Sequence, residues 1–140
     1  MKALIFLAAL ALFVITVSFF EYVGPLLLGI DGPDPTRYSD AAYMADFLAR
    51  QPAASFLLVA LAHFLGAVVG GLVLGLGGLG RRALWGLAIL CTIAGIANLV
   101  MLPGQPVWFW VLDLLTYAPG VWLGYTWVAR TRALVAERAA

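Results

Sequence analysis

The 140-residue sequence is 64% hydrophobic and 11% charged, with a mean hydropathy of +1.03. Charged residues make up about 25% of an ordinary soluble domain, so this composition excludes a water-soluble globular protein and indicates a membrane protein covered by lipid. A formal net charge of +1, with no basic run longer than Arg81-Arg82, argues against nucleic acid as a partner.

The first predicted membrane span covers residues 3–28 and follows a single Lys2. Its apolar run is longer than the roughly 7–15 residues of a signal-peptide core, so we expect a retained helix. The segment Asp31-Gly32-Pro33-Asp34-Pro35 follows. It cannot continue a helix, because its prolines remove backbone donors and its glycine loosens the backbone.

A short amphipathic helix is predicted over residues 40–50, in the first outer loop. Ser39 or Asp40 can cap its N-terminus, and Asp46 and Arg50 have the spacing of an i,i+4 ion pair. Its apolar side chains share one side: Tyr43, Met44, Phe47 and Leu48. Such a segment either lies flat on the membrane surface or covers the mouth of the bundle.

Three more spans are predicted over residues 53–79, 83–102 and 107–129. Together with the first they give an all-α, four-helix transmembrane bundle in a single membrane domain. The positive-inside rule then places both termini in the cytoplasm, as expected for a multi-pass protein of a bacterial inner membrane. The basic residues that flank this side are Lys2, Arg81, Arg82, Arg130, Arg132 and Arg138.

Each span carries one strongly polar side chain at a similar predicted depth, about 5–15 Å below the outer boundary at a rise of 1.5 Å per residue. An ionisable group in a membrane costs roughly 2.5–3.5 kcal/mol and marks a functional site by default. Helical spacing turns these groups towards the other helices. The polar cluster that we expect inside the bundle comprises Glu21, His63, Asn98, Asp113 and Tyr117.

Small residues follow the polar ones on the same helix faces and predict close helix packing, within the bundle rather than between two copies. The predicted packing glycines are Gly66, Gly70, Gly71, Gly75 and Gly95.

The predicted cluster has several interpretations. Two carboxyls and an imidazole without a lysine or arginine in the spans favour proton sharing, as in a proton relay or a proton-coupled carrier. The same groups suit a divalent metal such as zinc or manganese. A purely structural role is the third interpretation, with Asn98 forming a hydrogen bond across helices.

Catalysis and a resident cofactor are not predicted. Ser18 and Ser55 lack a plausible adjacent base, so we do not expect an enzyme. The single histidine, His63, could supply only one axial ligand to a haem. A divalent metal is the one cofactor left open.

The pattern as a whole is similar to small four-span bacterial membrane proteins that have no assigned activity. This resemblance covers most of the chain, and it implies no substrate. It rests on the proline-rich outer loop, the small-residue second span, Glu21 before Tyr22-Val23-Gly24-Pro25, and Pro106-Val107-Trp108-Phe109-Trp110. A first-span glutamate in a four-span protein also resembles the small multidrug resistance transporters, although their loops are tighter and hold no comparable helix.

Two functions therefore follow from the sequence. The first is a non-catalytic packing or accessory subunit, associated with copies of itself or with a larger membrane complex. The alternative is a proton-linked small-solute carrier or ion-binding protein that uses the intramembrane cluster.

Overall fold

The computed structural model describes residues 1–139, and over this range every regular element is a helix. The elements are α1 (Lys2–Leu28), the 3-10 turn η1 (Pro35–Arg37), α2 (Ala41–Ala49), α3 (Ala53–Leu76), α4 (Arg81–Met101) and α5 (Val107–Ala139). Helices α1, α3, α4 and α5 are each long and apolar enough to cross a membrane. The predicted all-α four-helix bundle is confirmed, and the chain has the character of a multi-pass membrane protein.

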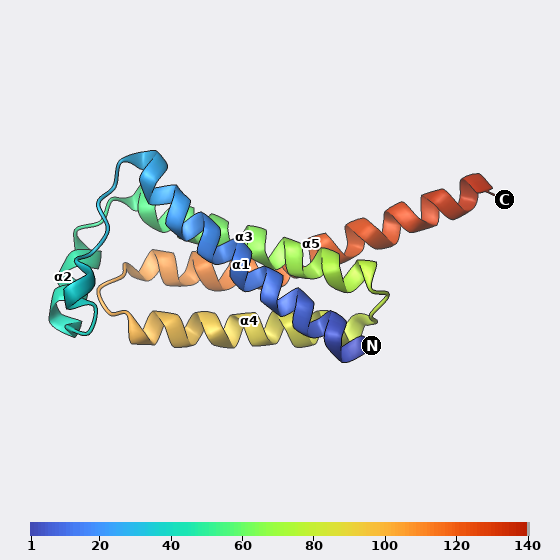
Figure 1. The fold of residues 1–140 in the computed structure, drawn as a ribbon, viewed down its shortest axis with the longest axis horizontal. Coiled ribbons are helices and arrows are strands. Elements are labelled where there is room, and N and C mark those ends of the chain that lie inside the picture. Colours follow the sequence, from blue (N-terminus) through green and yellow to red (C-terminus); the bar gives the residue numbers. More distant parts are fainter. Residues whose placement is uncertain (140) are drawn as a thin grey trace.

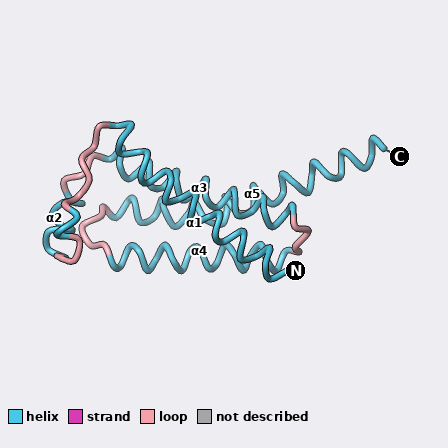
Figure 2. The backbone as a smooth tube through the Cα atoms, in the orientation of Figure 1, coloured by secondary structure: helices cyan, strands magenta, loops and turns pink. Residues whose placement is uncertain are grey.

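The four long helices run along the long axis of the molecule, with α1 crossing obliquely over the others (Figure 1). Helix α3 is central, because it packs extensively against both α5 and α1, whereas α4 packs mainly against α5. The two chain ends lie at one end of the bundle, which we call the terminal end, and α2 lies at the other, the α2 end. Figure 2 shows that the longest loop, between α1 and α3, is also at the α2 end.

Glycines set where several helices end. Helix α1 stops at Gly29, whose φ of 61° is left-handed, and the turn after α3 contains Gly78 with φ 66°. As a result α3 ends at Leu76, three residues before the predicted limit of the second span. Helix α5 instead continues past residue 129 to Ala139, because residues 130–139 contain neither glycine nor proline.

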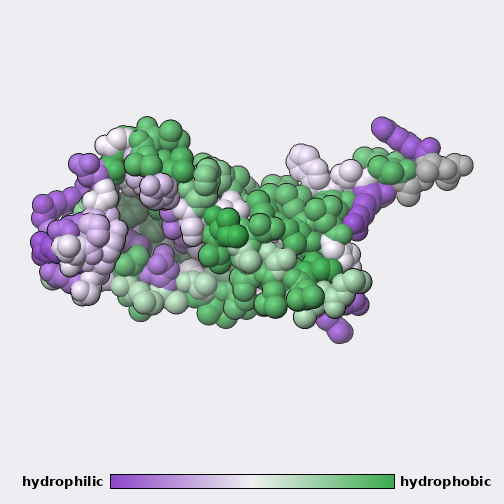
Figure 3. Space-filling view, viewed as in Figure 1, coloured by the Kyte–Doolittle hydropathy of each residue, from purple (hydrophilic) through white to green (hydrophobic). Residues whose placement is uncertain are grey.

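The outside of the bundle is apolar at mid-height and polar at both ends (Figure 3). This is the reverse of a soluble protein and matches a lipid-covered belt. Inside, one main core cluster joins all four long helices through residues such as Phe13, Leu74, Leu87 and Val121. A second, smaller core near the α2 end is centred on Phe56 and Phe109.

The predicted packing glycines lie at helix contacts within the bundle. A Cβ added at Gly66 would lie 2.7 Å from Val17 of α1, and one at Gly70 would lie 2.9 Å from Leu87 of α4. Towards α5, a Cβ at Gly71 would collide with the carbonyl oxygen of Val121, and one at Gly75 would lie 2.9 Å from Val128. The absence of side chains therefore allows α3 to approach its neighbours at backbone distance.

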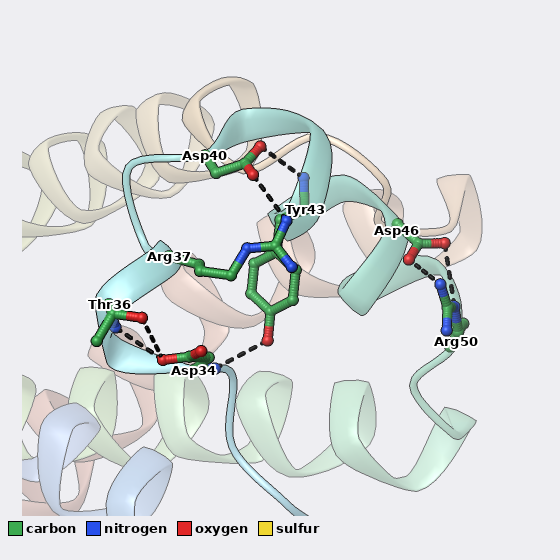
Figure 4. Close-up of polar contacts among 7 residues, drawn as sticks. All are labelled: Asp34, Thr36, Arg37, Asp40, Tyr43, Asp46 and Arg50. Atoms are coloured by element: carbon green, nitrogen blue, oxygen red, sulfur yellow. Dashed lines mark hydrogen bonds and ion pairs between the residues drawn. The ribbon is translucent and has the colours of Figure 1, made fainter.

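The loop at the α2 end is held by its own polar contacts (Figure 4). Asp40 caps α2 by accepting a hydrogen bond from the Tyr43 backbone N–H, and it forms an ion pair with Arg37 at 2.8 Å. Arg37 also lies 4.0 Å above the Tyr43 ring, whose hydroxyl accepts a hydrogen bond from the Asp34 N–H. Asp46 and Arg50 form the expected i,i+4 pair.

These contacts shift the pKa values of the charged groups in the loop. Hydrogen bonds from Thr36 hold the pKa of Asp34 below its usual value of 3.8. The guanidinium of Arg37 does the same for the pKa of Asp40, and in return the Arg37 pKa is raised. The loop is therefore an ordered cap stabilised by ionised carboxylates.

Candidate functional site

Four polar side chains from α1, α3 and α5 are in contact inside the bundle. His63 Nδ1 lies 2.5 Å from Asp113 Oδ1 and 3.1 Å from the Tyr117 hydroxyl. The Tyr117 hydroxyl donates a hydrogen bond to Asp113 Oδ2 at 3.1 Å. On the other side of the ring, His63 Nε2 lies 3.5 Å from Glu21 Oε1. The imidazole therefore stands between two carboxyl groups.

Local helix geometry positions these groups. Asp113 and Tyr117 are four residues apart and share one face of α5. Close packing of α3 on α5 brings His63 to that face. Pro25 lies inside α1 and has no N–H, so it cannot donate the helical hydrogen bond to the carbonyl oxygen of Glu21, four residues earlier.

The cluster has a buried end and an accessible end. Asp113 is 0% exposed and His63 is 6% exposed, whereas the Glu21 side chain is 40% exposed. A proton could therefore reach Glu21 from a cavity, whereas Asp113 is reached through the His63 and Tyr117 side chains that contact it. These contacts join an accessible carboxyl to a buried one.

The net charge of the cluster determines which charged species it can bind. When both ring nitrogens of His63 carry a proton, the imidazolium can donate towards one carboxylate on each side, and the three groups together carry one net negative charge. The described part of the chain places no lysine or arginine in ion-pair contact with them. One additional proton, or one bound monovalent cation, would make the cluster neutral, which a low-dielectric environment strongly favours.

Asn98 lies beside this cluster without joining it. It lines a cavity of about 160 Å³ together with Glu21, His63, Cys91, Gly95 and Tyr117. The structure records no hydrogen bond from its side chain to the four clustered groups. Gly95 has the tightest contact here, since a Cβ at this position would lie 2.6 Å from the Tyr117 hydroxyl.

A second cavity of about 200 Å³ leads from Glu21 towards the α2 end. Its walls are largely apolar and include the rings of Phe20, Phe47, Phe56 and Phe109. Glu21 and Asn98 line both cavities, so the larger one reaches the polar cluster at Glu21. Figure 3 shows the surface hollowed in this region, next to the loop that carries α2.

The polar groups of the larger cavity share one property. They are carboxyls, amides and a hydroxyl, and no lysine or arginine is among the lining residues. Gln105 is notable, because its side-chain oxygen is buried and has no hydrogen-bond partner. The polar lining residues are Glu21, Asp31, Gln51, Ser55, Asn98 and Gln105.

Helix α2 covers the mouth of this cavity. Its residues Phe47 and Leu48 line the wall, and the backbone of Ala45 is so close to Gly104 that a Cβ there would collide with it. In the structure this segment is a helix over the mouth of the bundle, and its placement flat on the membrane surface stays a prediction.

The metal interpretation of the cluster has no matching geometry. Within residues 1–139 as described, no group of three or more His, Cys, Asp or Glu side chains is arranged to hold a metal ion. The reason is that the His63 ring lies between the two carboxyls, with Nε2 towards Glu21 and Nδ1 towards Asp113. A metal would need both oxygens and the nitrogen to converge on one point.

Sequence reasoning missed several cavity residues. Gln105 lies in the break between the third and fourth predicted spans, and a glutamine enclosed by prolines in an otherwise apolar segment is itself a signal. Phe56 and Phe109 have apolar neighbours in the sequence, so nothing distinguished them from ordinary core residues. Only the fold shows that they line a cavity.

The sequence-based resemblances stay predictions. Comparisons of the chain with protein-family models, with curated proteins and with solved structures found no match.

Proposed function

We propose that this protein is a proton-linked carrier for small, largely apolar cations, such as protonated amines, in a bacterial inner membrane. The observation that carries the proposal is the contact chain from cavity-lining Glu21 through His63 to buried Asp113. Both termini would face the cytoplasm by the positive-inside rule, and the cavity beneath α2 would open to the outside.

Proton linkage follows from the charge of the cluster. A proton and a cationic solute each supply the one positive charge that neutralises it, so the two compete for the same site. Binding of one then releases the other, which is the elementary step of an exchange carrier. His63 connects the exposed carboxyl to the buried one, so a proton bound at Asp113 can leave through His63 and Glu21 when the solute arrives.

The proposed solute class follows from the cavity. Its polar lining offers hydrogen-bond acceptors and two carboxyls, Glu21 and Asp31, and the unpartnered oxygen of Gln105 needs a donor. Aromatic faces attract cations by about 0.5–2 kcal/mol. The charged residues that line the cavity are both acidic, so an anion would be repelled. An apolar body with a cationic or donor group fits both features.

Proton release on binding tests this proposal directly. Purified protein in a weakly buffered detergent solution is mixed with phenyltrimethylammonium, a permanently charged aromatic cation, and the pH is followed with an indicator dye. We expect release of about one proton per protein, by linkage. tert-Butylbenzene, which has the same shape and no charge, should release none.

Two variants make the result specific. Glu21→Gln should abolish proton release, because it removes the accessible carboxylate. Asp46→Asn is the matched control, since this carboxylate is exposed in the loop and pairs only with Arg50. In liposomes, the wild type and Asp46→Asn should couple cation entry to proton exit, and Glu21→Gln and Asp113→Asn should not. Equal behaviour of all four proteins would rule the proposal out.

The accessory-subunit function stays the second candidate, favoured by one observation on α1. Only 11% of the membrane-spanning window of this helix is buried, so most of it is free to contact lipid or another protein. Native mass spectrometry of complexes extracted from membranes would distinguish the two functions. A stable partner or homo-oligomer that survives Glu21→Gln and Asp113→Asn, without any proton release, would favour the accessory subunit.

A further inference from the structure

A cleft between α4 and α5 at the terminal end is separate from the polar cluster and its cavities. It has a volume of about 230 Å³, and its lining comprises Arg81, Leu84, Trp85, Trp122, Tyr125 and Thr126. Arg81 is the first residue of α4, so the cleft lies where that helix meets the membrane boundary. We propose that it is a binding site for one anionic phospholipid.

The mouth of the cleft attracts negative charge. Arg81 is exposed, and the described part of the chain gives it no ion pair or hydrogen bond to a side chain. No acidic residue lines the cleft. A phosphate can therefore pair with the guanidinium in a two-pronged contact, the geometry that arginine provides and lysine does not.

The wall of the cleft suits the remainder of a lipid. Trp85 and Trp122 are 47% and 48% exposed, and with Leu84 they form an apolar surface for an acyl chain. Tryptophan and tyrosine favour the level of the headgroups, where an apolar ring and a polar edge are both solvated. Basic sites between transmembrane helices are typical binding places for anionic headgroups.

The same lining disfavours zwitterionic lipids. Their ammonium group would lie beside the Arg81 guanidinium, and the cleft has no carboxylate to pair with that ammonium. The surrounding end of the bundle adds general attraction for negative charge. Its basic residues are Lys2, Arg81, Arg82, Arg130, Arg132 and Arg138, against the single acid Glu137.

Native mass spectrometry of the full chain tests the site. The detergent-solubilised protein is titrated with phosphatidylglycerol and with phosphatidylcholine that has the same acyl chains. We expect the first phosphatidylglycerol to bind about fivefold more tightly than phosphatidylcholine, the effect of one arginine near the membrane surface. Arg81→Gln should remove this preference, and Arg81→Lys should keep only part of it.

Arg82→Gln is the matched control, because Arg82 has the same charge at the same helix end but does not line the cleft. It should retain the preference. Glycerol phosphate, which has the headgroup charge without acyl chains, should not displace the bound lipid. Equal losses in Arg81→Gln and Arg82→Gln would overturn the proposal in favour of general surface charge. Displacement by glycerol phosphate would overturn it in favour of a free-anion site.

Discussion

His63 of α3 and Asp113 of α5 are 50 residues apart in sequence and 2.5 Å apart in space, between Nδ1 and Oδ1. Both side chains are closed off from the surface, at 6% and 0% exposure. A buried pair of this kind fixes the position of the two helices along their axes. If one helix shifted along the other, a polar group would be left in an apolar environment without a partner. The contact that would pass protons in the proposed function therefore also stabilises the packing of α3 on α5.

The first prediction concerns the stability that this buried contact provides. Asp113→Ala removes the buried carboxylate that both His63 Nδ1 and the Tyr117 hydroxyl contact, which should lower the free energy of unfolding by about 1–3 kcal/mol. Tyr117→Phe removes the hydroxyl but keeps the ring, and should cost about 0.5–1.5 kcal/mol. Titration with denaturing detergent, followed by helix content, measures both. Asp46→Asn should be neutral, and a comparable loss in this exposed control would contradict the structural role.

Periodicity and composition predicted most of the fold. The spans could be found because each apolar run exceeds the thickness of a membrane core and the breaks are rich in glycine and proline. Helix ends were less predictable. Leu79 belongs to no helix, because the turn needs Gly78 in a left-handed conformation, a requirement that hydropathy does not reveal.

The sequence indicated which residues form the candidate site but not which of them are in contact. Spacing along each helix gave Glu21, His63, Asp113 and Tyr117 an inward direction, and the structure brings these four into contact. Asn98 has the same predicted depth, yet its side chain only lines the cavity. Contact between Asn98 and the cluster depends on the rotation of α4 about its own axis. That rotation depends on the packing of all the helices together.

Glycine packing between α3 and α5 gives a second prediction. Gly71→Ala should destabilise the bundle by about 1–3 kcal/mol, because the new methyl group would collide with the backbone carbonyl of Val121, which cannot rotate away. Gly86→Ala is the control within a membrane helix. Its Cβ would meet only a Phe6 ring atom at 3.9 Å, so it should be neutral or slightly stabilising. The same unfolding titration compares them, and equal stability of the two variants would contradict the close α3–α5 approach.

The loop at the α2 end should be acid-sensitive. The pKa of Asp40 is lowered by Arg37, and that of Asp34 by Thr36, so ionisation of both stabilises the folded loop. For a carboxyl with a depressed pKa, this stabilisation is complete above its usual value of 3.8 and is lost as the pH falls through the lowered pKa. A spin label at Ala42→Cys should keep constant mobility from pH 7 to about 5 and become mobile well below about 4.

Two variants separate the contribution of Asp40 from general acid effects. Asp40→Ala should make the spin label mobile at neutral pH, because it removes the side chain that caps α2 together with the ion pair to Arg37. Asp46→Asn should not, since exposed i,i+4 pairs such as Asp46 with Arg50 contribute little. A label that stays immobile in Asp40→Ala would show that packing alone orders the loop.

The last prediction concerns the end of α3. Arg132 of α5 donates hydrogen bonds to the carbonyl oxygens of Gly75 and Leu76, at 3.1 and 2.6 Å. Leu76 lies at the helix end, where carbonyls lack an intrahelical donor, and Gly75 also accepts a hydrogen bond from the Gly78 N–H. Arg132→Gln should loosen this turn, and the backbone amides of residues 77–79 should exchange hydrogen about five times faster, corresponding to roughly 1 kcal/mol. Arg138→Gln is the control, because it removes the same charge farther along α5. Hydrogen exchange read by mass spectrometry distinguishes the two, and equal acceleration in both variants would mean that charge at this end, and not the Arg132 cap, holds the turn.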